Sequence, residues 1–140
     1  MPENMIEMEL NKIVIDEKRH DQLIVLKEKG GERMLPIVIG LAEASAIKLK
    51  LSGFVPPRPL THDLLHSTIG DLGAQIEKIV IDKLEENTFH AKVVLKTVSG
   101  QEKVVDARPS DSIALAVRAH APIFVEDDII KKSAIFNQDK

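Results

Sequence analysis

The chain has 140 residues, no cysteine and a formal net charge of −3 at pH 7. This length predicts one domain over residues 1–140, large enough to bury a core without disulfides or a structural metal. The lack of cysteine excludes disulfides and cysteine-bound zinc. The lack of a signal peptide or long apolar run predicts a cytoplasmic protein with no membrane contact. The acidic balance and the absence of Trp and Tyr exclude the basic, aromatic-rich surface of proteins that grip long nucleic acids.

The first part of the chain predicts three strands followed by a helix. Apolar residues alternate or run together in three segments, of which a Gly-Gly pair joins the last two as a hairpin: 6–16, 22–29 and 30–40. The sequence then changes to small residues, which predicts a helix over 41–51 with Ala42, Ala46 and Leu49 on one face. Gly53 is placed to end this helix.

The second part of the chain repeats the same order. It predicts three strands, the last two joined at a Ser-Gly turn, and then a helix: 75–84, 88–98, 102–107 and 109–119. In this alignment Glu43 corresponds to Asp111. We therefore expect an α+β fold: a single domain with an extensive mixed or antiparallel sheet and two duplicated βββα-like halves packed with short helices. The alternative is that two short strand-helix patterns coincide by chance.

The segment between the halves is expected to be ordered. Three prolines stiffen an extended connection, and Thr61 is a natural N-cap for a short helix that ends near Asp71. The predicted core spans about residues 6–125, where a last short strand ends. Residues 126–140 are expected to form an acidic turn or helical turn and then a polar tail that frays. Small residues of both longer helices should permit close approach to the sheet: Ala42, Ala44, Ala46, Ala114 and Ala116.

A polar cluster interrupts two apolar segments near the start of the second small-residue helix. Pro109 suits a first helical turn, where Ser110 and Asp111 can accept hydrogen bonds from free backbone N–H groups. Such a cap requires neither Asp106 nor Arg108. A strand end that faces a helix start is also a common place for anionic ligands. The cluster is therefore either a helix cap with ion pairs or one wall of a site.

Two residue pairs have a spacing that suits a metal ion. His62 and His66 are four apart on one helical face, but without a third ligand two surface histidines are the simpler interpretation. Glu43 most simply interacts with the start of its own helix. If the duplication is real, however, Glu43 and Asp111 could face each other across a pseudo-twofold axis and hold a divalent cation.

Three segments together resemble the bifunctional nuclease family, a group of small bacterial and plant domains: LPIVIGLAEASAI (35–47), RPLTHDLL (58–65) and DARPSDSIALAVR (106–118). The resemblance covers about residues 6–125. It implies an α/β fold with an extensive sheet, self-association, and nuclease activity on both DNA and RNA. The residues that match the two later motifs are Arg58, Pro59, Thr61, His62, Asp63, Asp106, Arg108, Pro109, Ser110, Asp111 and Ala114.

With a nuclease implied, the chemistry of phosphodiester hydrolysis suggests a role for each matched residue. Carboxylates can hold Mg²⁺ or Mn²⁺, a base can activate water, and cations can stabilise the charged transition state. We expect the metal ligands to be Asp63, Asp106 and Asp111, and the base to be His62. Arg58 and Arg108 are expected to supply the positive charge, and Thr61 and Ser110 to contact the substrate together with Arg58.

The expected substrate is short or single-stranded DNA or RNA, and the expected assembly is a homodimer. Many strand-like segments in a small chain leave sheet edges that need cover, which also favours a dimer. The alternative function is a non-catalytic, oligomeric binding or regulatory domain whose polar motifs only cap helices and fix the connector.

Overall fold

The computed structural model describes residues 4–16, 18 and 21–136, and its elements repeat one pattern twice along the chain. The first unit consists of β1 (Met5–Val14), β2 (Asp21–Glu28), β3 (Arg33–Gly40) and α1 (Leu41–Leu51). The second consists of β4 (Ala74–Glu85), β5 (Thr88–Thr97), β6 (Glu102–Ala107) and α3 (Pro109–Ala119). The remaining elements are α2 (Thr61–Asp71) between the units, and β7 (Ile123–Glu126), α4 (Asp127–Ser133) and β8 (Ile135–Phe136) after them.

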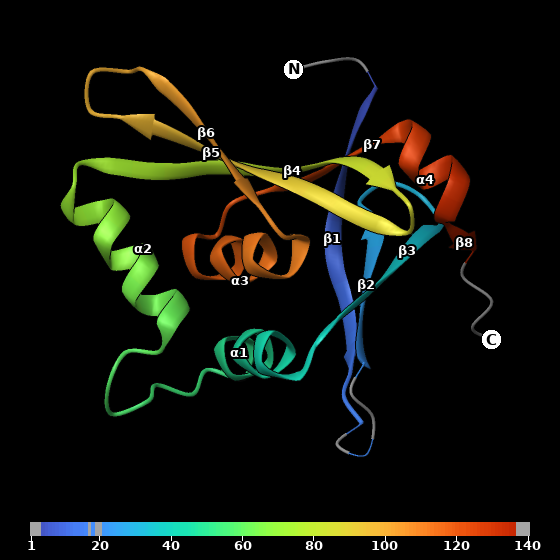
Figure 1. Ribbon diagram of the computed structural model, residues 1–140, viewed down its shortest axis with the longest axis horizontal. Coiled ribbons are helices and arrows are strands. Elements are labelled where there is room, and N and C mark those ends of the chain that lie inside the picture. Colours follow the sequence, from blue (N-terminus) through green and yellow to red (C-terminus); the bar gives the residue numbers. More distant parts are fainter. Residues whose placement is uncertain (1–3, 17, 19–20, 137–140) are drawn as a thin grey trace.

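All strands belong to one mixed sheet with the order β6-β5-β4-β7-β1-β2-β3-β8. Each half is an antiparallel meander, and β7 joins the two because it pairs parallel to β4 and antiparallel to β1. Figure 1 shows β1–β3 running across the direction of β4 and β5, with α1 and α3 together on one side of the second meander. The expected α+β fold with two βββα halves of related strand order is therefore confirmed.

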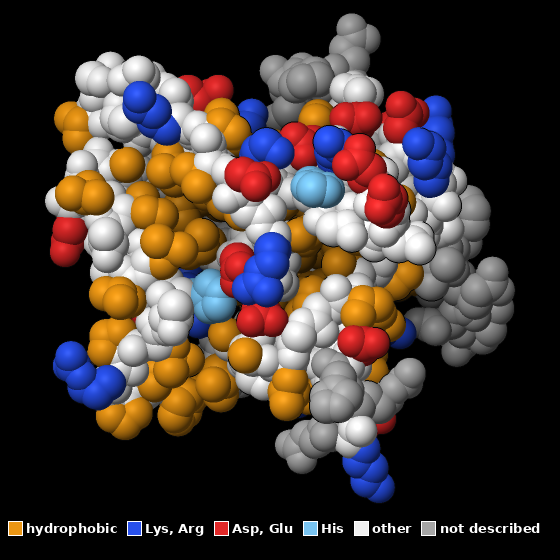
Figure 2. All heavy atoms as spheres, viewed as in Figure 1, with side chains coloured by type: hydrophobic (Ala, Val, Ile, Leu, Met, Phe, Trp, Pro, Cys, Tyr) orange, Lys and Arg blue, Asp and Glu red, His pale blue; other side chains and the backbone are white. Residues whose placement is uncertain are grey.

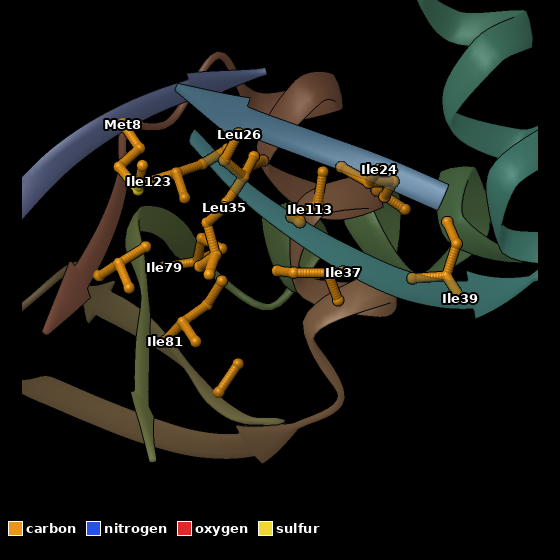
Figure 3. Close-up of a cluster of buried hydrophobic side chains, with 14 of the residues drawn as sticks. Met8, Ile24, Leu26, Leu35, Ile37, Ile39, Ile79, Ile81, Ile113 and Ile123 are labelled. Carbon is orange, nitrogen blue, oxygen red and sulfur yellow. The ribbon is translucent and has the colours of Figure 1, made fainter. Parts of the chain in front are cut away.

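The core lies between the two meanders and α3. Figure 3 shows side chains from β1, β2, β3, β4, β7 and α3 meeting there, among them Met8, Leu35, Ile81 and Ile113. These four side chains are at most 2 % exposed, so the helix and both halves of the sheet share one apolar interior. Burial of this kind stabilises a fold by roughly 25 cal/mol for each Å² of apolar surface removed from water.

Of the two helices rich in small residues, α3 buries the residues that we expected and α1 buries a different face. In α3, Ala114 and Ala116 are buried as expected, because this helix lies on the core. In α1 the buried stripe is Ala44, Ala46 and Ile47, whereas Ala42 is exposed and Leu49 is 37 % exposed. The expected face of Ala42, Ala46 and Leu49 is therefore wrong for two of its three members. The cause is that α1 packs along α3 and leaves its other side open.

The starts of the short helices also differ from expectation. Leu60, not Thr61, is the N-cap of α2, and the backbone N–H of Leu60 donates to the Asp63 carboxylate at 2.9 Å. In α3, Pro109 occupies the first position as expected. Within the described part of the chain no side chain caps this helix, so the predicted capping roles of Ser110 and Asp111 are wrong. Asp111 forms bonds to other side chains instead.

The C-terminal segment is more ordered than the predicted turn and polar tail. Residues of α4 pack into the core, where Ile129 and Ile130 are 4 % and 0 % exposed, and β8 pairs with β3. The helical alternative for the acidic turn is therefore correct, and the core extends past residue 125. Residues 137–140 of the predicted tail lie outside the described part of the chain. Within residues 4–16, 18 and 21–136, no helix has the length and apolar character needed to cross a membrane.

Candidate active site

A cavity of about 840 Å³, which we call the helix-start cavity, opens where α1, α2 and α3 begin. The first turns of these helices line it with Glu43, His62 and Asp111, while β5 and β6 form its floor through residues such as Val93 and Val105. Its far end is apolar, because Leu49, Leu65, Ile69 and Leu95 line it. Figure 2 shows hydrophobic side chains gathered over the α2 side of this face of the molecule. The polar residues therefore lie at one end of an apolar pocket.

Asp111 is the centre of the polar cluster. Its Oδ1 lies 2.8 Å from Nε2 of His62, and its Oδ2 accepts a hydrogen bond of 2.8 Å from Nε of Arg108. Desolvation by burial is the largest influence on the pKa of Asp111 and raises it. The hydrogen bonds and charges of His62 and Arg108 together outweigh that effect, so the pKa lies below its ordinary 3.8. Asp111 is therefore a carboxylate at neutral pH and holds both neighbours by charge-assisted bonds.

Arg108 links the two positions that correspond in the two halves. Its Nη2 lies 2.8 Å from Oδ2 of Asp111 and 3.7 Å from Oε2 of Glu43. The Arg108 guanidinium thus contacts both carboxylates and lies where the sequence suggested a divalent cation between Glu43 and Asp111. The pKa of Arg108 is raised, chiefly by its hydrogen bond to Asp111. The side chain is 66 % exposed, and Nη1 has no hydrogen-bond partner among the residues described. Arg108 therefore keeps donors available for a ligand.

His62 is held so that one ring nitrogen is occupied and the other is not. The side chain is 14 % exposed and directs Nε2 at Asp111. Within the described part of the chain, Nδ1 makes no hydrogen bond. With an ionised Asp111 as acceptor, the neutral imidazole is favoured as the Nε2–H tautomer, which leaves a lone pair on Nδ1. This arrangement is suited to a general base that a carboxylate orients.

Asp63 has a different set of partners, although it also lies in the first turn of a helix. Its Oδ1 accepts a bond of 2.7 Å from Nε of Arg118, and its Oδ2 accepts the bond from Leu60. The Leu60 N–H bond is the largest influence on the pKa of Asp63. Burial raises that pKa and Arg118 lowers it, and the result lies below 3.8. The Arg118 side chain is 3 % exposed and also donates to the carbonyl of Ala114. Asp63 therefore fastens α2 to α3.

Asp106 lies at the edge of the cavity, with its carboxylate turned to a lysine on the neighbouring strand. Its Oδ1 is 3.4 Å from Nζ of Lys92, which is also 3.6 Å from Oδ1 of Asp82. The Asp106 side chain is 79 % exposed. These three charges lie side by side on β4, β5 and β6. The Lys92–Asp106 ion pair is exposed to solvent, and such pairs contribute little to stability.

The remaining expected substrate contacts are more scattered. Thr61 lines the helix-start cavity beside His62. Ser110 is 5 % exposed and lines a neighbouring cavity, which Arg108 also lines. Arg58 is exposed on the connector and lines neither of these two cavities. The structure thus brings His62, Asp111, Arg108 and Thr61 together, with Asp106 at the rim, and leaves Arg58 outside.

The expected metal ligands do not form a three-carboxylate set. Asp63, Asp106 and Asp111 each contact a different basic residue, namely Arg118, Lys92 and Arg108. Among the residues described, no group of three or more His, Asp or Glu is arranged to hold a metal ion. These carboxylates, as arranged, do not fit a Mg²⁺ or Mn²⁺ ion, which needs several oxygen ligands at once.

Sequence reasoning missed two basic residues that decide the roles of the acids. Lys92 alternates with apolar residues in β5 and looks like any solvent-facing strand residue. Arg118 offers a clearer signal, because it is a lone charge at the end of the apolar run Ile113–Val117. A charged side chain at the end of a buried apolar helix is itself buried, and burial of a charge is costly unless an acidic side chain pairs with it. That acid is Asp63, 55 residues away in the chain.

The sequence profile of the bifunctional nuclease domain matches residues 24–138, which include all three helix starts of the cavity. The chain belongs to the bifunctional nuclease domain family. The matched segment contains His62, Arg108 and Asp111, so the polar cluster lies within the part of the chain that the family shares.

The chain is similar to proteins of two kinds: uncharacterised bacterial proteins and plant proteins named bifunctional nucleases. An uncharacterised protein of Mycobacterium tuberculosis is 38 % identical over 128 residues, which are 91 % of this chain and 76 % of that protein. A rice protein named bifunctional nuclease 1 (Oryza sativa subsp. indica) is 22 % identical over 112 residues, 79 % of this chain and 34 % of the rice protein. Bifunctional nuclease 2 of Oryza sativa subsp. japonica is 27 % identical over 124 residues, 86 % of this chain and 38 % of its own length.

Proposed function

We propose that this protein is a nuclease that hydrolyses phosphodiester bonds of DNA and RNA at the helix-start cavity. The observation that carries the proposal is the group of His62, Asp111 and Arg108, joined by contacts of 2.8 Å in the cavity wall. A base, a carboxylate that orients it and a cation are the parts that acid–base hydrolysis of a phosphate ester needs. Membership in the bifunctional nuclease domain family supports the choice of nucleic acid as substrate.

The proposed reaction begins with water near Nδ1 of His62. As the water oxygen attacks phosphorus, His62 takes one of its protons, and the carboxylate of Asp111 stabilises the imidazolium that forms. The Arg108 guanidinium stabilises the negative charge that develops on the phosphoryl oxygens. The bond between phosphorus and the leaving oxygen then breaks on the opposite side of phosphorus. A second water protonates the leaving oxygen there, and His62 returns its proton to the solvent. Because water is the nucleophile, the 2′-hydroxyl is not needed, so DNA and RNA can both react.

The charge of the site supports a short or single-stranded substrate. Glu43 and Asp111 both contact the one guanidinium of the cavity, Asp106 adds a third carboxylate at the rim, and the whole chain carries a net charge of −3. Such a surface can neutralise few phosphates, whereas tight binding to long nucleic acid rests on many such contacts. Affinity must therefore come from groups other than phosphate, which an unpaired base can offer and a stacked base pair cannot.

Two carboxylates at the same cavity provide a matched test. We expect Asp111→Asn to lower the cleavage rate of labelled single-stranded RNA and DNA by a factor on the order of 10³ or more, because the orienting charge on His62 is lost. Asp106→Asn should keep most of the rate, since the carboxylate of Asp106 contacts exposed Lys92. Equal loss in both variants would contradict the roles assigned here.

Cleavage is measured with Mg²⁺, with Mn²⁺ and with EDTA, because metal dependence stays a prediction of the sequence. Residual activity in EDTA supports the acid–base scheme, whereas loss of all activity in EDTA together with loss in Asp106→Asn supports the metal hypothesis. A pure protein that binds oligonucleotides but cleaves none under the three conditions would favour the non-catalytic binding domain.

The expected homodimer is also a proposal, and the edge of the sheet supports it. Within the described residues β6 pairs only with β5, and its Val104 and Val105 are 56 % and 47 % exposed. An open edge strand with apolar side chains is a surface on which a second copy can pair. Light scattering should return twice the chain mass of 15.5 kDa, and Val104→Glu, on the same strand but outside the helix-start cavity, should shift the protein to monomer. A wild-type monomer at micromolar concentration would contradict this proposal.

A further inference from the structure

A second cavity lies next to the helix-start cavity, and among the residues described the two share a single lining residue, Arg108. The second cavity, which we call the Phe89 cavity, has a volume of about 480 Å³. It lies between the end of β3, the β4–β5 turn and the start of α3, and Phe89, Gly40 and Ser110 are among the residues that line it. Arg108 is thus the boundary between two hollows rather than the end of one.

Both cavities lie along the same side of β5. Side chains of alternate residues in a strand point to the same face of the sheet, and Phe89, Ala91, Val93 and Leu95 are alternate residues. Phe89 lines one cavity, Val93 and Leu95 line the other, and Ala91 between them is fully buried. The two hollows are therefore consecutive along the strand.

The lining of the cavities differs in the way that two nucleoside subsites would. The helix-start cavity has aliphatic walls at Leu65, Ile69 and Leu95. The Phe89 cavity has an aromatic ring, and this chain has only four phenylalanines. Aliphatic and aromatic surfaces both suit the face of an unpaired base, and an aromatic ring stacks with any base. The cation that a phosphate requires stands between them, at Arg108.

We propose that a single nucleic-acid strand crosses Arg108 with one nucleoside in each cavity, so that the enzyme cuts internal phosphodiester bonds. This inference rests on the proposed function, because it places the reacting phosphate at Arg108. A terminal phosphomonoester has a nucleoside on one side only, so it fills one cavity and is held less well than a phosphodiester between two nucleosides. A paired strand cannot place its bases in the two hollows without leaving its partner, so duplexes are excluded until they open.

The first experiment measures binding, which does not depend on catalysis. Fluorescence anisotropy with a labelled phosphorothioate hexanucleotide, which resists hydrolysis, is compared for single strand and duplex. Phe89→Ala and Leu65→Ala should each weaken single-strand binding by at least about five-fold, since a stacked or apolar base contact is lost in each. Phe89→Leu keeps the apolar bulk of a residue that packs on the core, so it reports on stacking if Phe89→Ala fails to fold.

Two variants outside the groove serve as matched controls. Leu64 precedes Leu65 in α2 and is 61 % exposed, and it lines neither cavity. Phe124 in β7 lies under the ammonium group of Lys78, away from both cavities. Leu64→Ala and Phe124→Leu should bind single strands as the wild type does.

A salt titration of wild-type binding counts the phosphate contacts. With a single phosphate contact at Arg108, a plot of the logarithm of the binding constant against the logarithm of the salt concentration should have a slope of about −0.7.

The second experiment follows products from a 5′-labelled single-stranded hexanucleotide. Products of every length should appear together from the start, because each linkage of the hexanucleotide joins two nucleosides. Stepwise shortening from one end would contradict the proposal. The proposal of two nucleoside subsites would be overturned if Phe89→Ala and Leu65→Ala both bound the single strand as the wild type does, or if duplex and single strand bound equally. Either result would leave the proposed hydrolysis intact. A wild type that binds the single strand through Phe89 and Leu65 but cuts nothing would instead overturn the proposed function and keep the groove.

Discussion

The contact between Asp63 and Arg118 allows a stability prediction that separates structural from catalytic acids. Asp63→Ala removes the acceptor for a guanidinium that is 3 % exposed and lies between α1, α2 and α3. The carbonyls of Ala114 and Ala46 remain as partners, at 2.9 and 3.5 Å, but no carboxylate then balances the charge. We expect α2 to loosen from α3 and the protein to lose stability.

The magnitude follows from the burial of the pair. Removing one partner of a buried ion pair costs about 3–5 kcal/mol. Asp63 keeps 28 % of its side chain exposed, so the lower end, about 3 kcal/mol, applies here. For a chain of 140 residues, 1 kcal/mol corresponds to a shift in Tm of about 3–4 °C, so the variant should melt roughly 10 °C below the wild type.

The assay is thermal unfolding followed by circular dichroism at pH 7 and at lower pH. Asp71→Ala, at the exposed far end of the same helix, is the control and should change Tm by less than about 2 °C. Because the folded-state pKa of Asp63 lies below 3.8, its contribution is complete above that pH and is lost as the pH falls through the folded value. The difference between wild type and Asp63→Ala should therefore shrink in acid. A shift at pH 7 no larger than that of Asp71→Ala would refute the reasoning.

Two further predictions concern charge. Glu43→Gln removes a carboxylate 3.7 Å from Nη2 of Arg108, so single-stranded oligonucleotides should bind several-fold more tightly by anisotropy, and weaker binding would contradict the arrangement. Glu28→Gln should lower Tm at pH 7, because Glu28 and Arg33 are 2.9 Å apart and this bond is the main reason that the pKa of Glu28 lies below 4.5. That deficit should disappear as the pH falls below the folded value, and a deficit that persists in acid would show that the carboxylate charge is not its cause.

The order of elements could be predicted from the sequence, because alternation, glycines and small residues signal strands, turns and helices locally. The hairpin between β5 and β6 illustrates this: the strands pair antiparallel across the predicted Ser-Gly turn, where Gly100 has a φ of 88° that favours glycine. The same local signals set the start of α2 one residue too late, since the Asp63 carboxylate folds back on Leu60.

The roles of the acids could not be predicted from local sequence. Glu43, Asp63 and Asp111 all lie in first turns of helices, where an acid interacts favourably with the helix dipole. What separates them is a tertiary partner: Arg118 for Asp63, and His62 with Arg108 for Asp111. The apolar end of the cavity was equally hidden, because Leu65 and Ile69 look like the inward face of any amphipathic helix.

The central claim is that His62, oriented by Asp111, acts as the base, and one pair of variants tests it most directly. His66 lies one turn further along α2 and contributes to neither cavity, so His62→Gln and His66→Gln differ only in contact with the site. The rate of cleavage of single-stranded RNA and DNA is measured for both variants, purified alongside the wild type through the same columns. We expect a loss of about 10²–10⁴-fold in His62→Gln and a wild-type rate in His66→Gln. Equal rates in the two variants would contradict it.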